Sequence, residues 1–356
     1  DEADMTRPHL VVGSVAGVGV GLVWLLSLAA PAAGQPPRSS DQVDVARLIV
    51  DARVLNEDGE PMLGLELSDF EVRVGGQPAR VESVQWIGGE AGMNVPILAG
   101  SLGGVLERTA RGRLVVFVVQ KSLDRDRLVG LLRLLQNTGR LFSALTPTDR
   151  VAVLSFDSHL KIWLDFTDDL ERAQRVLADD VMFREPAALE PGSGVSLMSK
   201  LNRVSAGETY TIEDALRVLG DALEPLPGSK SVVLLGHGFG EMTVTLGVFG
   251  GRPTRRYGEA RDALYGARAA VFSLDVTDVD YHTFEHGLET VSAETGGLFV
   301  RTRNRVIGAI EEVTHALVGH YVLFTELPDL DAGTHRIEVE LTQTDGSVFA
   351  RTIYDH

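Results

Sequence analysis

Donor side chains for a ligand or a metal ion follow two apolar runs of the chain, at the point where each run ends. They are Gln120, Ser122 and Asp124 after residues 114–119, and His237 after residues 231–235. In an open parallel sheet, the loops at the carboxyl ends of the strands build the ligand crevice. The amide, hydroxyl and carboxylate oxygens are hard donors of the kind Mg²⁺ prefers, whereas the histidine nitrogen suits zinc or nickel. These residues are therefore the first candidates for a binding site.

A second set of donors occurs at residues 282–286, which read His-Thr-Phe-Glu-His. This H-x-x-E-H spacing is that of the inverted zinc peptidases. On a helix the two histidines would share one face, and Glu285 would serve as general base. The third ligand would have to be Glu338 or Glu340, which lie far downstream. We therefore expect that the chain is not an enzyme, and a zinc metallohydrolase is the alternative.

The composition excludes several classes of protein. The chain has 356 residues, enough for one large or two modest domains, and 44% of them are hydrophobic, which is ample for a core. The formal net charge of −17 argues against a nucleic-acid partner, because nucleic-acid binding needs a basic face. It also argues against adsorption to anionic lipid. The absence of cysteine excludes disulfides and thiolate chemistry.

The first 34 residues predict export. A short, weakly basic start at residues 5–9 precedes residues 10–30, which carry no charge, and the small residues that begin at Pro31. This is the layout of a secretory signal peptide. The apolar stretch is also long enough to span a bilayer, so a retained membrane anchor is the alternative. We expect a secreted, periplasmic or cell-envelope protein that meets a membrane only through this segment.

Two segments toward the ends of the chain predict a β domain. Alternating apolar and polar residues mark strands at 48–54, 70–74, 79–86, 320–324, 335–341 and 348–354. Neither segment has enough strands to form a stable sheet by itself. We therefore expect residues 43–86 and 319–356 to pack together as a β-sandwich-like domain.

Between these segments, short apolar runs alternate with amphipathic stretches. Strands are expected at 114–119, 150–156, 231–235, 270–275 and 298–301, with an antiparallel edge strand at 162–166, and helices at 124–144, 168–179, 213–223, 257–267 and 284–295. Continuous apolar runs are typical of strands whose two faces are both covered by helices. The fold class is therefore α/β, with a doubly wound, mostly parallel, Rossmann-like sheet and the flanking β domain.

The predicted organisation has six parts. They are residues 1–34 as signal peptide or anchor, 35–42 as linker, 43–86 as the N-terminal β segment, 87–112 as a Gly-rich linker, 113–318 as the α/β domain, and 319–356 as the C-terminal β segment. Two loops of the α/β domain, at 181–208 and 239–257, are long for such a fold. Long loops in compact domains are usually functional or disordered. The second loop is expected to be an interface or an inserted hairpin.

Several motifs resemble the von Willebrand factor A-type domain, and more closely a bacterial VWFA-related family first described in acidobacteria. In the α/β block they are residues 145–156, around Thr146-Pro147-Thr148-Asp149-Arg150, and residues 164–169 and 293–297; in the flanks they are residues 59–65, 69–72 and 320–323. The resemblance covers residues 43 to 354. It implies an A-type α/β domain carried on the flanking β segments.

The resemblance also implies a degenerate metal site. In the family, one loop reads D-x-S-x-S and a second carries an Asp, and together they hold a divalent cation. Here only Ser122 matches outright, while Gln120 and Asp124 replace the first Asp and the last Ser, and His237 replaces the second Asp. Both Asp positions are lost, so we expect no Mg²⁺ and no other cofactor.

A third loop of the family usually supplies a Thr. An ungapped match places Tyr210 at that position, and a shift of one residue places Thr209 or Thr211 there. The candidate ligand-binding face, a vestigial metal-ion-dependent adhesion site, thus comprises Gln120, Ser122, Asp124, Thr209, Thr211 and His237. We expect an exported, non-enzymatic protein-interaction or adhesion module that binds a protein partner at the cell envelope through this face. A structural envelope component is a further alternative.

Overall fold

The apolar runs at the centre of the chain form one sheet. The computed structural model describes residues 46–88, 112–189, 194–245, 248–252 and 254–355. The central sheet has the order β12-β11-β8-β5-β6-β7. Its strands are β5 (Leu114–Gln120), β6 (Arg150–Phe156), β7 (Leu160–Thr167), β8 (Lys230–Gly236), β11 (Ala269–Asp275) and β12 (Phe299–Arg301). All pairs are parallel except β6 with β7. The predicted α/β fold with an antiparallel edge strand is confirmed.

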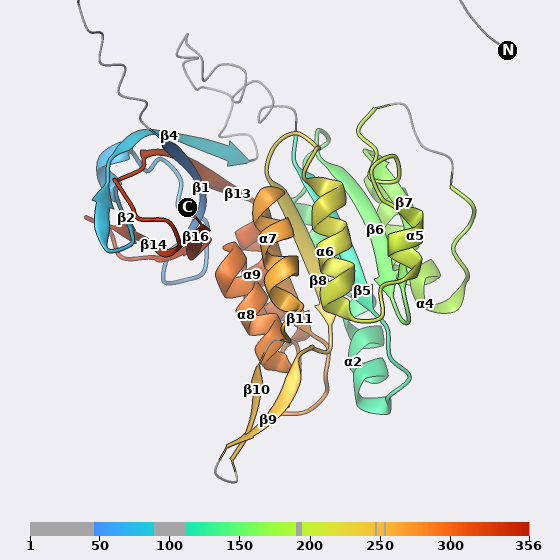
Figure 1. Ribbon diagram of the computed structural model, residues 1–356. Helices are drawn as coiled ribbons and strands as arrows, with labels where there is room; N and C mark the ends of the chain where they lie inside the picture. The colour runs from blue at the N-terminus through green and yellow to red at the C-terminus, as the bar shows by residue number, and fades with distance from the viewer. Residues whose placement is uncertain (1–45, 89–111, 190–193, 246–247, 253, 356) are drawn as a thin grey trace, which may run out of the picture. The chain divides into compact units, whose positions relative to one another are not determined.

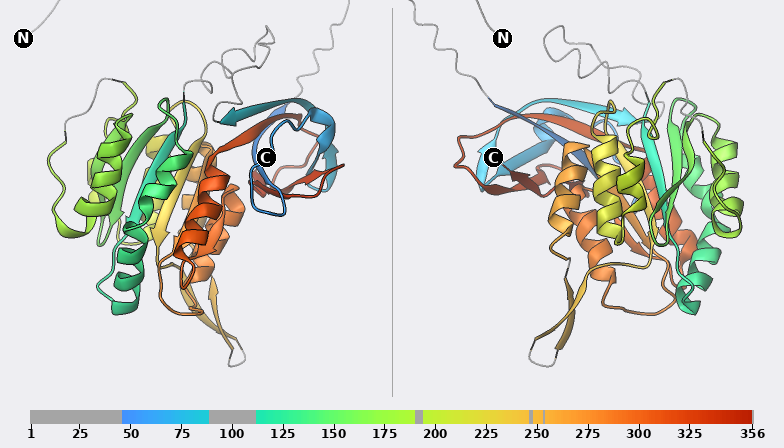
Figure 2. Two further views of the ribbon diagram at one scale, coloured as in Figure 1. Left: turned by 180° about the vertical axis from the view of Figure 1, so that it is seen from behind. Right: turned by 45° about the vertical axis from the view of Figure 1, so that its right-hand side comes forward.

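Helices cover both faces of this sheet (Figures 1 and 2). The helices are α2 (Arg125–Leu135), α3 (Leu170–Arg175) and α9 (Val306–Leu317) on one face, and α6 (Ile212–Leu223), α7 (Tyr257–Gly266) and α8 (Glu285–Thr295) on the other. Successive residues of a strand point to opposite faces. Phe117 therefore packs in the first core, whereas its neighbours Val116 and Val118 pack in the second.

Some elements differ from the prediction. The helix expected at 124–144 ends at Leu135 and is followed by a 3-10 segment, Thr138–Ala144, where the Thr138 hydroxyl donates to the Leu135 carbonyl. The helix expected at 168–179 is α3, a π-helical segment Val176–Asp180 and the short α4 (Val181–Phe183). Helix α9 is not among the expected helices. The two long loops contain the short helix α5 (Arg203–Gly207) and the antiparallel hairpin of β9 (Glu241–Thr245) and β10 (Val248–Arg252).

The flanking segments form two further sheets, with the orders β15-β1-β13-β4 and β16-β14-β2-β3. Their strands are β1 (Arg47–Leu55), β2 (Phe70–Val74), β3 (Gln77–Ala79), β4 (Val81–Gly88), β13 (Gly319–Glu326), β14 (Thr334–Leu341), β15 (Ser347–Ala350) and β16 (Ile353–Asp355). Val50, Val72 and Tyr321 belong to their common core. The predicted β-sandwich-like flank made by N- and C-terminal strands is therefore confirmed. The strand expected at 348–354 is divided into β15 and β16, one in each sheet.

The predicted signal peptide, the linker at 35–42 and nearly all of the Gly-rich linker lie outside the described residues. Within the described residues, no helix is both long and apolar enough to span a membrane.

Candidate functional site

The two donor loops meet where the winding of the central sheet reverses. Numbered along the chain, the strands of this sheet lie in the order 3-2-1-4-5-6, so the reversal falls between β5 and β8. Ligands of open α/β sheets bind outside the carboxyl ends of the strands at such a point. Gln120 ends β5, and His237 directly follows β8.

The Gln120 side chain joins these two loops directly. Its amide oxygen accepts a hydrogen bond from the His237 backbone N–H, and its amide nitrogen donates to the Gly238 carbonyl, each at 3.0 Å. The side chain is buried, and both ends of the amide are engaged. The loop needs glycine at position 238, because its φ is 97° and an added Cβ would collide with the Phe284 carbonyl. The amide bridge between the loops will be called the Gln120 clamp.

The other predicted donors serve mainly to hold local structure. The Ser122 hydroxyl accepts from the Asp124 N–H, and the Asp124 carboxylate caps α2 by accepting from two backbone N–H groups. The Thr211 hydroxyl caps α6 by accepting from the Asp214 N–H. Thr209 is 1% exposed, and its hydroxyl accepts from the Leu160 N–H and donates to the Ala206 carbonyl. The structure thus places Thr209 in the interior of the domain.

A shallow depression of about 270 Å³ lies beside the clamp. Its lining includes Gln120, Arg127, Thr211, Glu213 and His237. Glu213 is 2% exposed and accepts a hydrogen bond from the Thr254 hydroxyl. Burial, reinforced by the positive charge of Arg127, lowers the pKa of the His237 imidazole to about 4. The imidazole is therefore neutral at pH 7, and the depression presents both charged and neutral polar groups.

The H-x-x-E-H residues do not form the arrangement that the alternative requires. Helix α8 begins at Glu285, so His282 precedes the helix, and His286 is exposed and pairs with Glu289. His282 contacts the buried Asp275 carboxylate at 2.8 Å. Single ligand atoms of Asp275, His282 and Glu285 do lie within 4.8 Å of one another. The Glu285 carboxylate, however, accepts two hydrogen bonds from Arg301, which already balances its charge.

Large apolar side chains stand exposed in the loops at this edge of the sheet. Leu123 follows β5 and is 96% exposed, Tyr281 follows β11 and is 61% exposed, and Tyr210 precedes α6 and is 76% exposed. Aromatic side chains are enriched in the centres of protein interfaces. Of these three residues, only Tyr210 is a candidate from the sequence, as a position of the metal site. The sequence does hold a signal for Leu123 and Tyr281, because each follows a predicted strand and stands next to a candidate donor, Ser122 or His282.

Lowering the pH from 7 to 5 should reduce stability through His237. The unfolded imidazole takes up a proton near pH 6.5, whereas the folded imidazole stays neutral until about pH 4. The unfolded state therefore binds more protons, and the free energy of unfolding falls by about 2 kcal/mol from this group. Urea unfolding of His237→Gln at both pH values should show a loss smaller by that amount. The exposed His286→Gln is the control, and an equal loss in wild type and His237→Gln would refute the assignment.

Comparisons with known proteins give structural matches only. No protein-family model matches the chain, and no curated protein matches it. An aerotolerance-related membrane protein from Bacteroides fragilis matches at 14% identity and a TM-score of 0.38, covering 58% of this chain and 98% of that one. BatB from Bacteroides thetaiotaomicron matches at 16% identity and 0.38, with 58% and 97% covered. A von Willebrand factor type A protein from Catenulispora acidiphila matches at 11% identity and 0.40, with 83% and 74% covered.

These identities and TM-scores carry no argument about a ligand or an activity. The fold is shown by the chain's own architecture: the doubly wound strand order, the antiparallel edge strand β7, and helices on both faces. This is the von Willebrand factor A-type fold that the sequence motifs resemble.

Proposed function

We propose that this chain is an exported, non-enzymatic protein-interaction module of the von Willebrand factor A type. Its binding face consists of the loops that follow β5, β8 and β11 and of the loop before α6, with Leu123, Tyr210 and Tyr281 as exposed anchors. The observation that carries the proposal is that three large apolar side chains stand exposed in the loops at the edge of the sheet that also holds the polar depression. Exposed apolar patches rimmed by polar groups mark protein interfaces.

The donor set does not fit the divalent cation that the fold family implies. Mg²⁺ requires near-octahedral oxygen coordination. The Gln120 amide is occupied on both sides, Thr209 is buried and engaged, and His237 offers nitrogen. The Gln120 clamp links the same two loops that a cation would link in the family. Binding at this face therefore rests on shape, apolar contact and hydrogen bonds, and it needs no metal.

The partner we propose is a protein of the cell envelope, and the chain meets a membrane only through its N-terminal segment. The predicted signal peptide and the strongly acidic composition support this location and argue against nucleic acid. A purely structural envelope role would leave the three anchors without a partner.

Photo-crosslinking tests the proposal. The crosslinking amino acid p-benzoylphenylalanine is placed at Leu123 or Tyr281 in the full chain, and at Leu63 of the β flank as a control with 53% exposure. In envelope extract, the first two positions should yield one discrete protein adduct, and a chelator should not change it. Loss of the adduct with chelator would contradict metal independence. Equal adducts from all three positions would contradict the assigned face.

A further inference from the structure

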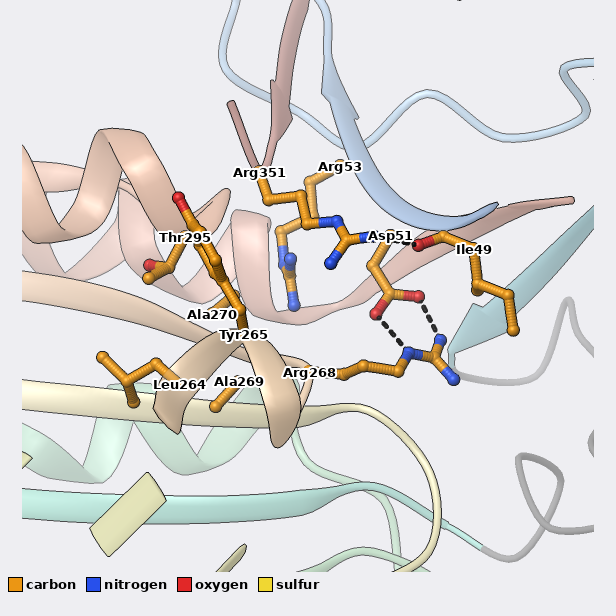
Figure 3. Close-up of a pocket in the computed structure, with 10 residues that line it drawn as sticks. All are labelled: Ile49, Asp51, Arg53, Leu264, Tyr265, Arg268, Ala269, Ala270, Thr295 and Arg351. Carbon is orange, nitrogen blue, oxygen red and sulfur yellow. Dashed lines mark hydrogen bonds and ion pairs between the residues drawn. The ribbon is translucent and has the colours of Figure 1, made fainter. Parts of the chain in front are cut away.

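A small cavity between β1 and α7 is lined by more arginines than carboxylates (Figure 3). Its charged lining residues are Asp51, Arg53, Arg268 and Arg351. Arg268 makes two hydrogen bonds to the Asp51 carboxylate, at 3.1 and 2.5 Å, so these two charges balance each other. The other two arginines therefore determine the charge of the cavity.

Neither Arg53 nor Arg351 has an ion pair within the described residues. Arg53 is 3% exposed, and its single hydrogen bond runs to the Gly296 carbonyl at 3.1 Å, with the guanidinium above the Phe272 ring. Arg351 donates to the Ile49 carbonyl at 3.2 Å, and its Nε is buried without a partner. An arginine side chain carries five N–H donors. Among the described residues, the Arg351 Nε–H is thus a buried donor without an acceptor.

Two further titratable groups interact with Asp51, namely His320 and Lys230, and neither is negatively charged at pH 7. Burial lowers the pKa of His320 to about 3, so this histidine is neutral at pH 7. Lys230 is 3% exposed, and burial lowers its pKa to about 8, so it still carries most of its charge. Burial also lowers the pKa of Arg53, to about 10. The Asp51 carboxylate also attracts Arg53 and Arg351, but this one carboxylate faces three arginines. An excess of buried charge of one sign is strongly unfavourable.

We propose that this cavity binds a chloride ion, held by Arg53 and Arg351. The space open to the centre of a water-sized sphere is about 20 Å³. Roughly 10–15 Å³ of such space accommodates one water. A monatomic anion fits this room, whereas sulfate or phosphate does not. The Asp51 carboxylate is bound at both oxygens by Arg268, and its single negative charge leaves a net positive charge among the three arginines of the lining.

Thermal unfolding of the full chain tests the site. At equal ionic strength, the melting temperature should be higher in sodium chloride than in sodium gluconate by roughly 2–5 °C, and it should rise with the chloride concentration. Arg351→Gln should abolish this difference. Arg336→Gln, whose side chain is 77% exposed, should preserve it. Equal melting temperatures of the wild type in the two salts would overturn the proposal, as would an equal effect of sulfate.

A crystal grown in sodium bromide gives an independent measurement that does not depend on a variant folding. The expected result is an anomalous peak between the guanidinium groups of Arg53 and Arg351. A cavity that contains only water, with no anomalous peak, would overturn the proposal.

Discussion

Removal of residues 319–356 should leave the remaining chain unable to form a soluble monomer. Strand β13 lies between β1 and β4 and pairs with both, and β14 lies between β16 and β2. Tyr321 and Leu323 are 1% and 0% exposed and fill the core that β1 and β2 share. The deletion would expose the apolar face of β1, both edges of β1, and one edge each of β2 and β4. Unpaired strand edges promote aggregation.

Size-exclusion chromatography and hydrogen exchange measure this effect. A chain that ends at Thr352 is the control, because it lacks only β16, which pairs with three residues at the edge of a sheet. This control should remain monomeric. A soluble chain without residues 319–356 that keeps native protection of amides 48–54 would show that the two flanking segments fold independently.

Asp149→Ala should lower the free energy of unfolding by about 3–5 kcal/mol, the usual cost of breaking a buried ion pair. Asp149 is 1% exposed and accepts from the backbone N–H and the guanidinium of Arg113, and from the Thr146 N–H. Arg113 in turn donates to the carbonyls of Ala144, Leu317 and Val318. It therefore joins the segment that precedes β6 to the end of α9. Without Asp149, the buried Arg113 charge would be unpaired.

Urea unfolding at pH 7 measures the change, with Asp168→Ala as the matched control. Asp168 pairs with Arg150 at 3.7 Å and its side chain is 64% exposed, so this variant should change stability by about 0.5 kcal/mol or less. Burial raises the pKa of the Asp149 carboxyl, but hydrogen bonds and attraction to Arg113 outweigh burial and hold the pKa below its usual range. The stabilisation is thus present above the unfolded pKa near 4 and is lost as the pH falls through the lower folded pKa. A change at pH 7 as small as that of Asp168→Ala would contradict this account.

Strands were predictable because burial on both faces leaves a continuous apolar run. The run at 114–119 became β5, and the alternating run at 70–74 became β2, in which every second residue is buried. Helix ends were less predictable. The residues after Leu135 stay partly apolar, yet the Thr138 hydroxyl bonds to the Leu135 carbonyl and the chain continues as a 3-10 segment.

The candidate site was predictable in position but not in bonding. A donor after an apolar run identifies the crevice, because the carboxyl ends of parallel strands meet at one edge. The partners of Gln120 lie 117 and 118 residues away, and no local pattern shows that its amide is occupied. For the same reason, the sequence could not show that Thr209 is buried whereas Tyr210 is exposed. Likewise, Arg268 and Arg351 lie far from Asp51 in the sequence, so no local pattern predicts that they line one cavity with it.

Titration calorimetry of the full chain with Mg²⁺ and Mn²⁺ tests the central claim most directly, namely that the Gln120 clamp and not a cation joins the loops after β5 and β8. We expect no heat of specific binding with either metal, and identical titration curves for the wild type and Ser122→Ala. A stoichiometric site of micromolar affinity that is lost in Ser122→Ala would contradict the claim.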